Sequence, residues 1–365
     1  MAQETKYGII SDVHQDPGIV PVAIDLLKRL GAEKLLVNGD IGERRATLQD
    51  SQRYVGFILD SIGKSGLESF VQPGSHETLL SFGPALDHFA GKYSNIVDAT
   101  KNSKVEQRGH SLVFLPGSDF SCGGEYQIGN HRQIPSGRYV RLEEGGLMQF
   151  EDFNQYVAAL QCGLAQGAMQ YANMGDLQKL VNDPDKTIMV CHVPRRFDDV
   201  ETCVDMAEFG DIEKTFFADF VIYEDGDEQV VIYYEEGKSG MIQKPKSVKS
   251  IVRGQIFQEG SVFPIESAKR FVSYGAPVKI KRENRGNEDL KTLYEELGIN
   301  KAVNGHFHES GHRANDRMGR HVPEGDLVTE LFWNSGHLDV GQTGILTVGD
   351  GKVSYKNIRL EEHLN

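Results

Sequence analysis

Long apolar runs are absent from this sequence. The longest are short, such as the run at residues 230–234, whereas a membrane-spanning helix needs about 20 predominantly apolar residues. The first six residues, Met-Ala-Gln-Glu-Thr-Lys, also lack the basic segment followed by an apolar stretch that marks a secretory signal. These absences predict a cytoplasmic protein without a membrane partner.

Cysteine is scarce and its spacing is uninformative. The four cysteines, Cys122, Cys162, Cys191 and Cys203, are far apart and form no paired motif. A disulfide scaffold and a cysteine zinc site are therefore both disfavoured, and the pattern is typical of a reducing cytosol. We interpret the four residues as thiols without a catalytic role.

Positive charge is in deficit. The chain has 39 Lys and Arg against 53 Asp and Glu, and its formal net charge is −14. A field of this sign repels nucleic acid at long range, so long duplexes are not expected partners. An anionic substrate would need local positive charge, which bound metal ions can supply. The 365 residues and the 39% hydrophobic fraction are otherwise typical of a globular protein with a sizeable core.

Apolar runs alternate with helical patterns along much of the chain, which predicts an α/β fold with mainly parallel inner strands. Strands are expected at residues 6–10, 34–37, 68–71, 111–115 and 187–191. A helical pattern is expected over residues 151–181. The alternation of strands and helices ends at about residue 198. The stretch that follows is β-rich and irregular, with a hairpin predicted around Asp225-Gly226. We therefore predict a core in two parts, residues 1–197 and 287–365, with an insertion or cap at 198–286.

Carboxylates and imidazoles stand where the predicted strands end. They come from five separate segments, and the loops beyond the carboxyl ends of parallel strands meet at one edge of a sheet. A mixture of imidazole and carboxylate suits zinc, iron or manganese, whereas calcium takes oxygen ligands. A single histidine is more often a packed or surface residue, but five such segments together predict a metal centre. The side chains are Asp12, His14, Asp40, His76, His192, His306 and His308.

The order of these segments resembles the calcineurin-like metallophosphoesterases. The matching motifs are Asp12-Val13-His14, Gly39-Asp40, Gly74-Ser75-His76-Glu77, His192 and Gly305-His306-Phe307-His308. The resemblance covers roughly residues 5–120, 186–197 and 287–365, and leaves the predicted insertion unexplained. It implies two facing β-sheets flanked by helices.

The resemblance also implies roles for individual residues. The first metal ion would be held by Asp12, His14, Asp40 and His308, and the second by Asp40, His192 and His306, with Asp40 bridging. His76 would stabilise the transferring phosphoryl group or protonate the leaving oxygen. The expected cofactors are two divalent ions (Mn, Fe, Zn or Ni), with manganese favoured for assays.

One position departs from the family pattern. Ser75 stands where the family has an asparagine ligand. A hydroxyl is shorter than an amide, so it either binds the ion weakly or leaves the place to water. We therefore predict a second metal site of lower affinity or altered metal selectivity.

Basic side chains near the motifs are weaker signals. Arg44, Arg195 and Arg196 can contact a substrate phosphate or can equally be solvated surface residues. A basic stretch inside the predicted insertion can grip an anionic substrate or a nucleic-acid segment as a lid, although a solvated loop is the favoured interpretation. That stretch consists of Lys238, Lys244, Lys246, Lys249 and Arg253.

The function predicted from these features is hydrolysis of a small phosphomonoester or phosphodiester by in-line attack of a metal-bound hydroxide. Two alternatives stay open. One is a non-catalytic scaffold or sensor that keeps the fold and binds a partner, and the other is a metal-dependent nuclease. The ligands do not separate monoesters from diesters, and the sequence does not indicate an oligomeric state.

Overall fold

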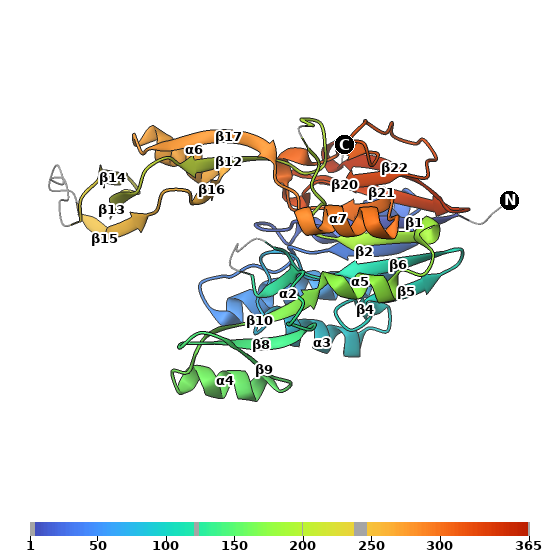
Figure 1. Cartoon of the computed structure of the whole chain (residues 1–365), viewed down its shortest axis with the longest axis horizontal. Helices are drawn as coiled ribbons and strands as arrows, with labels where there is room; N and C mark the ends of the chain where they lie inside the picture. The colour runs from blue at the N-terminus through green and yellow to red at the C-terminus, as the bar shows by residue number, and fades with distance from the viewer. Residues whose placement is uncertain (1–3, 120–123, 199, 237–246, 364–365) are drawn as a thin grey trace. The chain divides into compact units, whose positions relative to one another are not determined.

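The computed structural model describes residues 4–119, 124–198, 200–236 and 247–363. The chain divides into two compact units (Figure 1). One consists of Met1–Met206 with Asn284–Asn365, and the other of Ala207–Glu283. The predicted insertion at 198–286 contains the second unit. Cys122, Lys238, Lys244 and Lys246 lie outside the described residues.

The first six-stranded sheet of the larger unit has the order β22-β21-β1-β2-β3-β4. Strands β1 to β4 run parallel, and β21 and β22 add antiparallel on the other side of β1. In Figure 1 the C-terminal strands β21 and β22 (red) lie beside the N-terminal strand β1 (blue). The strands are β1 (Thr5–Ile10), β2 (Lys34–Asn38), β3 (Glu68–Gln72), β4 (Ile96–Asp98), β21 (Gln342–Gly349) and β22 (Lys352–Arg359).

The second six-stranded sheet has the order β19-β20-β18-β11-β6-β5. Strands β6, β11, β18 and β20 run parallel, and the two edge strands are antiparallel to their neighbours. The strands are β5 (Lys104–Gln107), β6 (His110–Leu115), β11 (Thr187–Cys191), β18 (Lys301–Asn304), β19 (Ala314–Asn315) and β20 (Leu331–Asn334).

The two large sheets pack face to face through one hydrophobic core. Alternate residues of each strand enter this core; Phe70 of β3, for example, meets Phe114 of β6 with ring centroids 5.8 Å apart. The intervening residues, such as Val37 and Val71, pack on the other side against helices. Strands buried on both faces are apolar at nearly every position, which is why their runs are visible in the sequence. The predicted mixed α/β class is confirmed.

Helices cover the outer faces of both sheets. The helices α1 to α3 share a core with the first sheet, and α5 and α7 share one with the second. They are α1 (Ile19–Arg29), α2 (Leu48–Lys64), α3 (Phe82–Lys92), α5 (Leu177–Leu180) and α7 (Glu288–Leu297). Among the described residues, no helix combines the length and apolar character needed to cross a membrane.

The helix predicted over residues 151–181 is wrong in its middle part, where a strand interrupts it. Helix α4 (Phe153–Gln161) ends early because Gly163 takes a left-handed backbone conformation with φ 68°. The chain continues as β10 (Ala165–Asn173), which pairs with two strands of a third sheet of order β7-β10-β8-β9. The other strands are β7 (Tyr126–Gly129), β8 (Gly137–Leu142) and β9 (Leu147–Gln149).

The smaller unit contains two three-stranded sheets and the helix α6 (Ile265–Ser273). Its core is rich in phenylalanine, with Phe216, Phe257 and Phe271 in mutual ring contact. The predicted hairpin is confirmed, since β13 pairs antiparallel with β14 around Gly226 at φ 88°. The strands are β12 (Met206–Ile212), β13 (Phe216–Tyr223), β14 (Glu228–Tyr233), β15 (Val248–Phe257), β16 (Val262–Pro264) and β17 (Val278–Asn284).

Candidate metal centre

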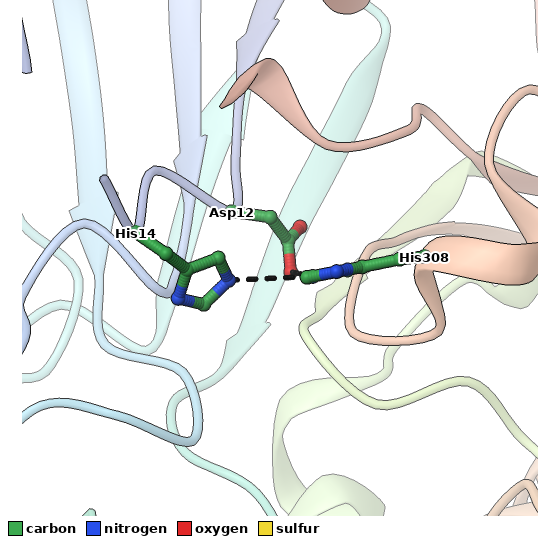
Figure 2. Close-up of side chains that lie close together, drawn as sticks. All are labelled: Asp12, His14 and His308. Atoms are coloured by element: carbon green, nitrogen blue, oxygen red, sulfur yellow. Dashed lines mark hydrogen bonds and ion pairs between the residues drawn. The ribbon is translucent and has the colours of Figure 1, made fainter. Parts of the chain in front are cut away.

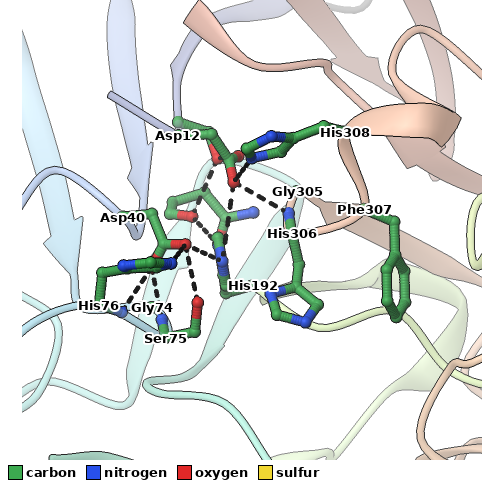
Figure 3. Close-up of polar contacts among 12 residues, drawn as sticks. Asp12, Asp40, Gly74, Ser75, His76, His192, Gly305, His306, Phe307 and His308 are labelled. Atoms are coloured by element: carbon green, nitrogen blue, oxygen red, sulfur yellow. Dashed lines mark hydrogen bonds and ion pairs between the residues drawn. The ribbon is translucent and has the colours of Figure 1, made fainter. Parts of the chain in front are cut away.

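The predicted ligands stand just beyond the carboxyl ends of parallel strands from both large sheets. Asp12, Asp40 and His76 follow β1, β2 and β3 of the first sheet, while His192 and His306 follow β11 and β18 of the second. Figure 3 shows these side chains converging on a common region. Because the sheets pack face to face, their carboxyl-terminal loops meet at one end of the sandwich.

The backbone at the ligands is unusual. Asp12, Asp40 and His306 all have a positive φ, of 55°, 52° and 70°, a conformation that non-glycine residues seldom adopt and that clusters at functional sites. Neighbouring glycines allow the loops to approach. A Cβ on Gly74 would lie 2.4 Å from Oδ1 of Asp40, and a Cβ on Gly305 would lie 2.5 Å from Oδ2 of Asp12. Both positions therefore require glycine.

The first ligand group consists of Asp12, His14 and His308, whose potential ligand atoms lie within 4.8 Å of one another. Nε2 of His308 is 3.3 Å from both Oδ1 of Asp12 and Nε2 of His14 (Figure 2). Asp12 is fully buried. Burial alone would raise its pKa, but His192 and His308 outweigh burial and hold the pKa of Asp12 well below its usual range.

The second ligand group consists of Asp40, His192 and His306. Nε2 of His192 lies 3.0 Å from Oδ2 of Asp40 and 3.8 Å from Oδ1 of Asp12, so this imidazole stands between the two carboxylates. The same Oδ2 lies 4.0 Å from Nε2 of both His14 and His76. His14, Asp40 and His76 form a third group with ligand spacing. Asp40 is not in the first group, but its Oδ2 lies 4.0 Å from Nε2 of His14, which is, so this carboxylate stands beside both groups.

The protonation of His192 tests whether these residues fit a metal ion. Its Nδ1 lies 2.8 Å from the carbonyl oxygen of Asn38, which can only accept, so Nδ1 carries a proton. Its Nε2 is buried and faces carboxylate oxygens, with Oδ2 of Asp40 at 3.0 Å. A ring nitrogen this close to a carboxylate oxygen needs a positive charge between the two atoms, supplied either by a proton on the nitrogen or by a bound metal ion. The residues therefore fit a divalent ion.

Ser75 does not point its hydroxyl toward open space. Its Oγ donates to Oδ2 of Asp40 at 2.8 Å, and the main-chain N–H groups of Ser75 and His76 both donate to Oδ1 at 2.5 and 3.0 Å. The loop after β3 thus holds both oxygens of the bridging carboxylate. The serine hydroxyl is engaged with Asp40 in the place where the sequence resemblance implies an amide ligand.

Glu43 is a site residue that the sequence analysis missed. Its two oxygens lie 3.3 Å from Nδ1 of His14 and 3.4 Å from Nδ1 of His76. One carboxylate therefore orients two imidazoles so that both present Nε2 to Asp40. Burial would raise the pKa of Glu43, but the hydrogen bonds from His14 and His76 lower it to about 2. The available signal was an acidic residue three positions after Asp40, which matches no motif quoted above.

Glu77 joins two of the ligand loops. It is fully buried, and its oxygens accept main-chain N–H groups from Ile41 at 2.7 Å, Gly42 at 3.0 Å and Gly74 at 2.7 Å. The first two donors follow Asp40, and the third precedes Ser75. Burial and the charge of Asp40 raise the pKa of Glu77 to about 7.

Replacing Glu77 with glutamine is expected to lower the free energy of unfolding by about 1–3 kcal/mol. The amide oxygen can keep Ile41 and Gly42 as donors, but the amide nitrogen would then face the N–H of Gly74 and leave it unsatisfied in a buried site. Urea unfolding of the metal-free protein measures the effect. Glu106→Gln, at an exposed position of β5, provides the control and is expected to leave stability unchanged. Equal stability of both variants would contradict the joining role of Glu77.

The three arginines predicted to bind substrate are engaged with carboxylates of the protein. Arg44 is exposed and lies 3.9 Å from Glu125. Arg195 is buried, stacks over Phe197 and Phe332, and pairs with Glu295 at 3.0 Å. The third, Arg196, pairs with Glu288 and Asp198. None of the three belongs to the ligand groups found among the described residues.

Comparison with known proteins gives no family assignment. No family model matches the chain, and no curated protein matches it. Solved structures do match over nearly the whole chain. The crystal structure of the protein TT1561 of Thermus thermophilus is 10% identical, with 98% of this chain and 100% of that chain covered at a TM-score of 0.46. Another crystal structure is 12% identical with the same coverage at a TM-score of 0.45, and likenesses at this level carry no conclusion about function.

Proposed function

We propose that this protein hydrolyses a small phosphate ester at a centre of two divalent ions bridged by Asp40. The observation that carries the proposal is that the buried Nε2 of His192 lies 3.0 Å from Oδ2 of Asp40 and 3.8 Å from Oδ1 of Asp12, within groups that have the spacing of metal ligands. The order of the ligand segments and the packing of two large sheets support a calcineurin-like metallophosphoesterase fold. Ions in such a centre lower the pKa of bound water and neutralise phosphoryl charge.

The protein's own residues then have distinct tasks. Asp40 would bridge the two groups, since its Oδ2 lies 3.0 Å from Nε2 of His192 in the second group and 4.0 Å from Nε2 of His14 in the first. His76 is the side chain best placed to meet a substrate, since 30% of it is exposed. Burial lowers the pKa of His76, but Glu43 and Asp40 outweigh burial and raise it. An imidazolium there can stabilise the phosphoryl oxygens or protonate the leaving oxygen.

The decisive assay compares two simple esters. The protein is freed of metal, reloaded with Mn²⁺, and incubated with p-nitrophenyl phosphate beside bis-p-nitrophenyl phosphate, a nucleotide panel and a single-stranded oligonucleotide. Hydrolysis that requires the metal and disappears with chelator is the expected result. A metal-loaded protein that leaves every ester intact would contradict the proposal and favour the non-catalytic scaffold, whereas cleavage confined to a single-stranded oligonucleotide would favour a nuclease.

The Ser75 position gives a second prediction for metal binding. The wild-type protein is expected to bind one ion tightly and the other more weakly, because Ser75 Oγ is engaged with Asp40 rather than acting as a ligand. Ser75→Asn is expected to tighten the weaker site about tenfold or more, equivalent to about 1.4 kcal/mol. Titration of the metal-free protein with Mn²⁺ measures both constants.

Ser75→Ala is the matched control for that titration. It removes the hydroxyl that donates to Asp40 without adding a ligand, so it should not tighten the second site. Two equally tight sites in the wild-type protein, or no gain in the asparagine variant, would defeat the prediction.

A further inference from the structure

We propose that the loop of residues 335–340 positions the first ligand group and makes it the site that fills first. The proposal rests on the metal centre described above and adds the residues that set its loading order. None of the loop's side chains belongs to the ligand groups found among the described residues. Its contacts nevertheless reach the loops of all three ligands in the first group.

Asp339 fixes the backbone at His14. Its Oδ2 accepts the main-chain N–H of His14 at 2.8 Å and that of Gln15 at 3.0 Å, and its Oδ1 accepts the N–H of Asp16 at 3.4 Å. Next to it, the N–H of Leu338 donates to the carbonyl of Ser11 at 3.1 Å, beside Asp12. One turn of chain thus holds the segment that carries two of the three ligands.

His337 fixes the third ligand, His308. The two rings are stacked, with centroids 4.1 Å apart and an angle of 20° between their planes. The side chain of His308 is 38% exposed, so without this contact it would keep rotamer freedom that metal binding must remove. Ordering the ring beforehand reduces that entropic cost.

The loop is itself held by the neighbouring strands. The N–H of Ser335 donates to the carbonyl of Asn304 at 3.3 Å, and the side chain of Asn334 donates to the carbonyls of Gly305 and Phe307. Gly336 has φ 85°, and a Cβ there would lie 2.5 Å from Oε1 of Gln342. Because the loop is itself held in place, its contacts can fix the positions of the ligands in the first group.

Both ligand groups have supporting contacts, since Asn38 holds His192 and the loop after β3 holds Asp40, but the groups differ in the ligands available. The first is contacted by the 335–340 loop at the segment that carries Asp12 and His14 and at His308. The second has Ser75 where the sequence resemblance implies an additional ligand, and that hydroxyl is bonded to Asp40. Supporting contacts of this kind contribute about 10–100-fold to metal affinity. The first group should therefore fill at a lower metal concentration than the second.

The test isolates each group and uses Co²⁺ alone as the probe. His306→Ala leaves the first group intact, and His308→Ala leaves the second. Adding Asp339→Ala to the His306→Ala protein should weaken Co²⁺ binding about 10–100-fold. The same substitution in the His308→Ala protein should change binding less than about threefold. Co²⁺ titration followed by visible absorption measures both, and circular dichroism verifies that each variant is folded.

Conservative variants separate positioning from general damage. Asp339→Asn keeps an oxygen for the N–H groups of His14 and Gln15, so it should restore most of the affinity lost in Asp339→Ala. His337→Phe should likewise bind better than His337→Ala because it keeps the stacked ring. Asp316→Ala serves as the control, since Asp316 accepts two main-chain N–H groups in a loop without a ligand.

An equal effect of Asp339→Ala on both groups, or no effect on the first, would overturn the inference. Should Asp339→Ala fail to fold, the comparison of His337→Ala with His337→Phe decides by itself. None of these measurements uses a phosphate ester. A protein that binds Co²⁺ in this order but hydrolyses nothing would refute the proposed function and leave the positioning role standing.

Discussion

Replacing Asp40 with asparagine is expected to reduce phosphate-ester hydrolysis at least about a thousandfold, equivalent to about 4 kcal/mol of transition-state stabilisation. Oδ1 of Asp40 accepts the main-chain N–H groups of Ser75 and His76, and an asparagine oxygen can do the same. The amide nitrogen would then occupy the place of Oδ2, where it cannot bind an ion. The loop should stay in position while the bridge between the ions is lost.

Metal content and rate together test this prediction. The variant should bind fewer than two ions per chain by elemental analysis. Circular dichroism without metal should show that it is folded, although loss of the ion pair with His192 is expected to lower its melting temperature. Asp60→Asn is the matched control, because Asp60 forms ion pairs with Lys64 and Lys92 on helices outside the ligand loops. A variant that kept two ions and a tenth of the activity would exclude Asp40 as the bridge.

Metal affinity is expected to rise steeply with pH. Burial lowers the pKa of His192, but Asp40 and Asp12 outweigh burial and raise it to about 10; for His14, Glu43 and Asp40 likewise outweigh burial and raise the pKa to about 9. At pH 7 both imidazoles are therefore protonated in the metal-free protein. His14 belongs to the first ligand group and His192 to the second, so each ion must displace one proton, and the affinity of each site should increase up to about tenfold per pH unit below pH 9. The dependence should level off above pH 10.

The stability of the metal-free protein should change in the opposite sense. Both histidines have folded-state pKa values above the unfolded value of about 6.5, so their ion pairs contribute stability that is complete below that pH. This stability is lost as the pH rises through 9 to 10. Calorimetric titration in buffers of different ionisation enthalpy counts the released protons, and thermal melts without metal follow the stability. Affinity that varied less than about threefold per pH unit between pH 7 and 9 would contradict the assignment.

The sequence predicted the elements that local patterns define. The strands that end before Asp12, Asp40 and His192 each contain a short run of apolar residues buried on both faces of the sheet, and such runs are readily recognised. The convergence of their loops followed from the general behaviour of parallel sheets. The structure brings these side chains together at one end of the sandwich.

The supporting residues could not be predicted in the same way. Glu43, His337 and Asp339 act through contacts between loops, and Asp339 is 325 residues away from His14 in the chain. No repeating pattern of residue types in the sequence indicates contacts between such distant loops. Strand β10 was missed for a different reason: its residues are compatible with a helix, and only pairing with β7 and β8 makes it a strand.

The ligands of the centre come from two sheets that otherwise meet through apolar side chains. A pair of ions bound to Asp40 on one sheet and His192 on the other would tie the layers together at one end, as a cross-link does. Sliding of one sheet against the other would then stretch coordination bonds as well as rearrange apolar side-chain contacts. The same ions that are proposed to promote hydrolysis would thereby restrict the low-frequency motions of the whole sandwich.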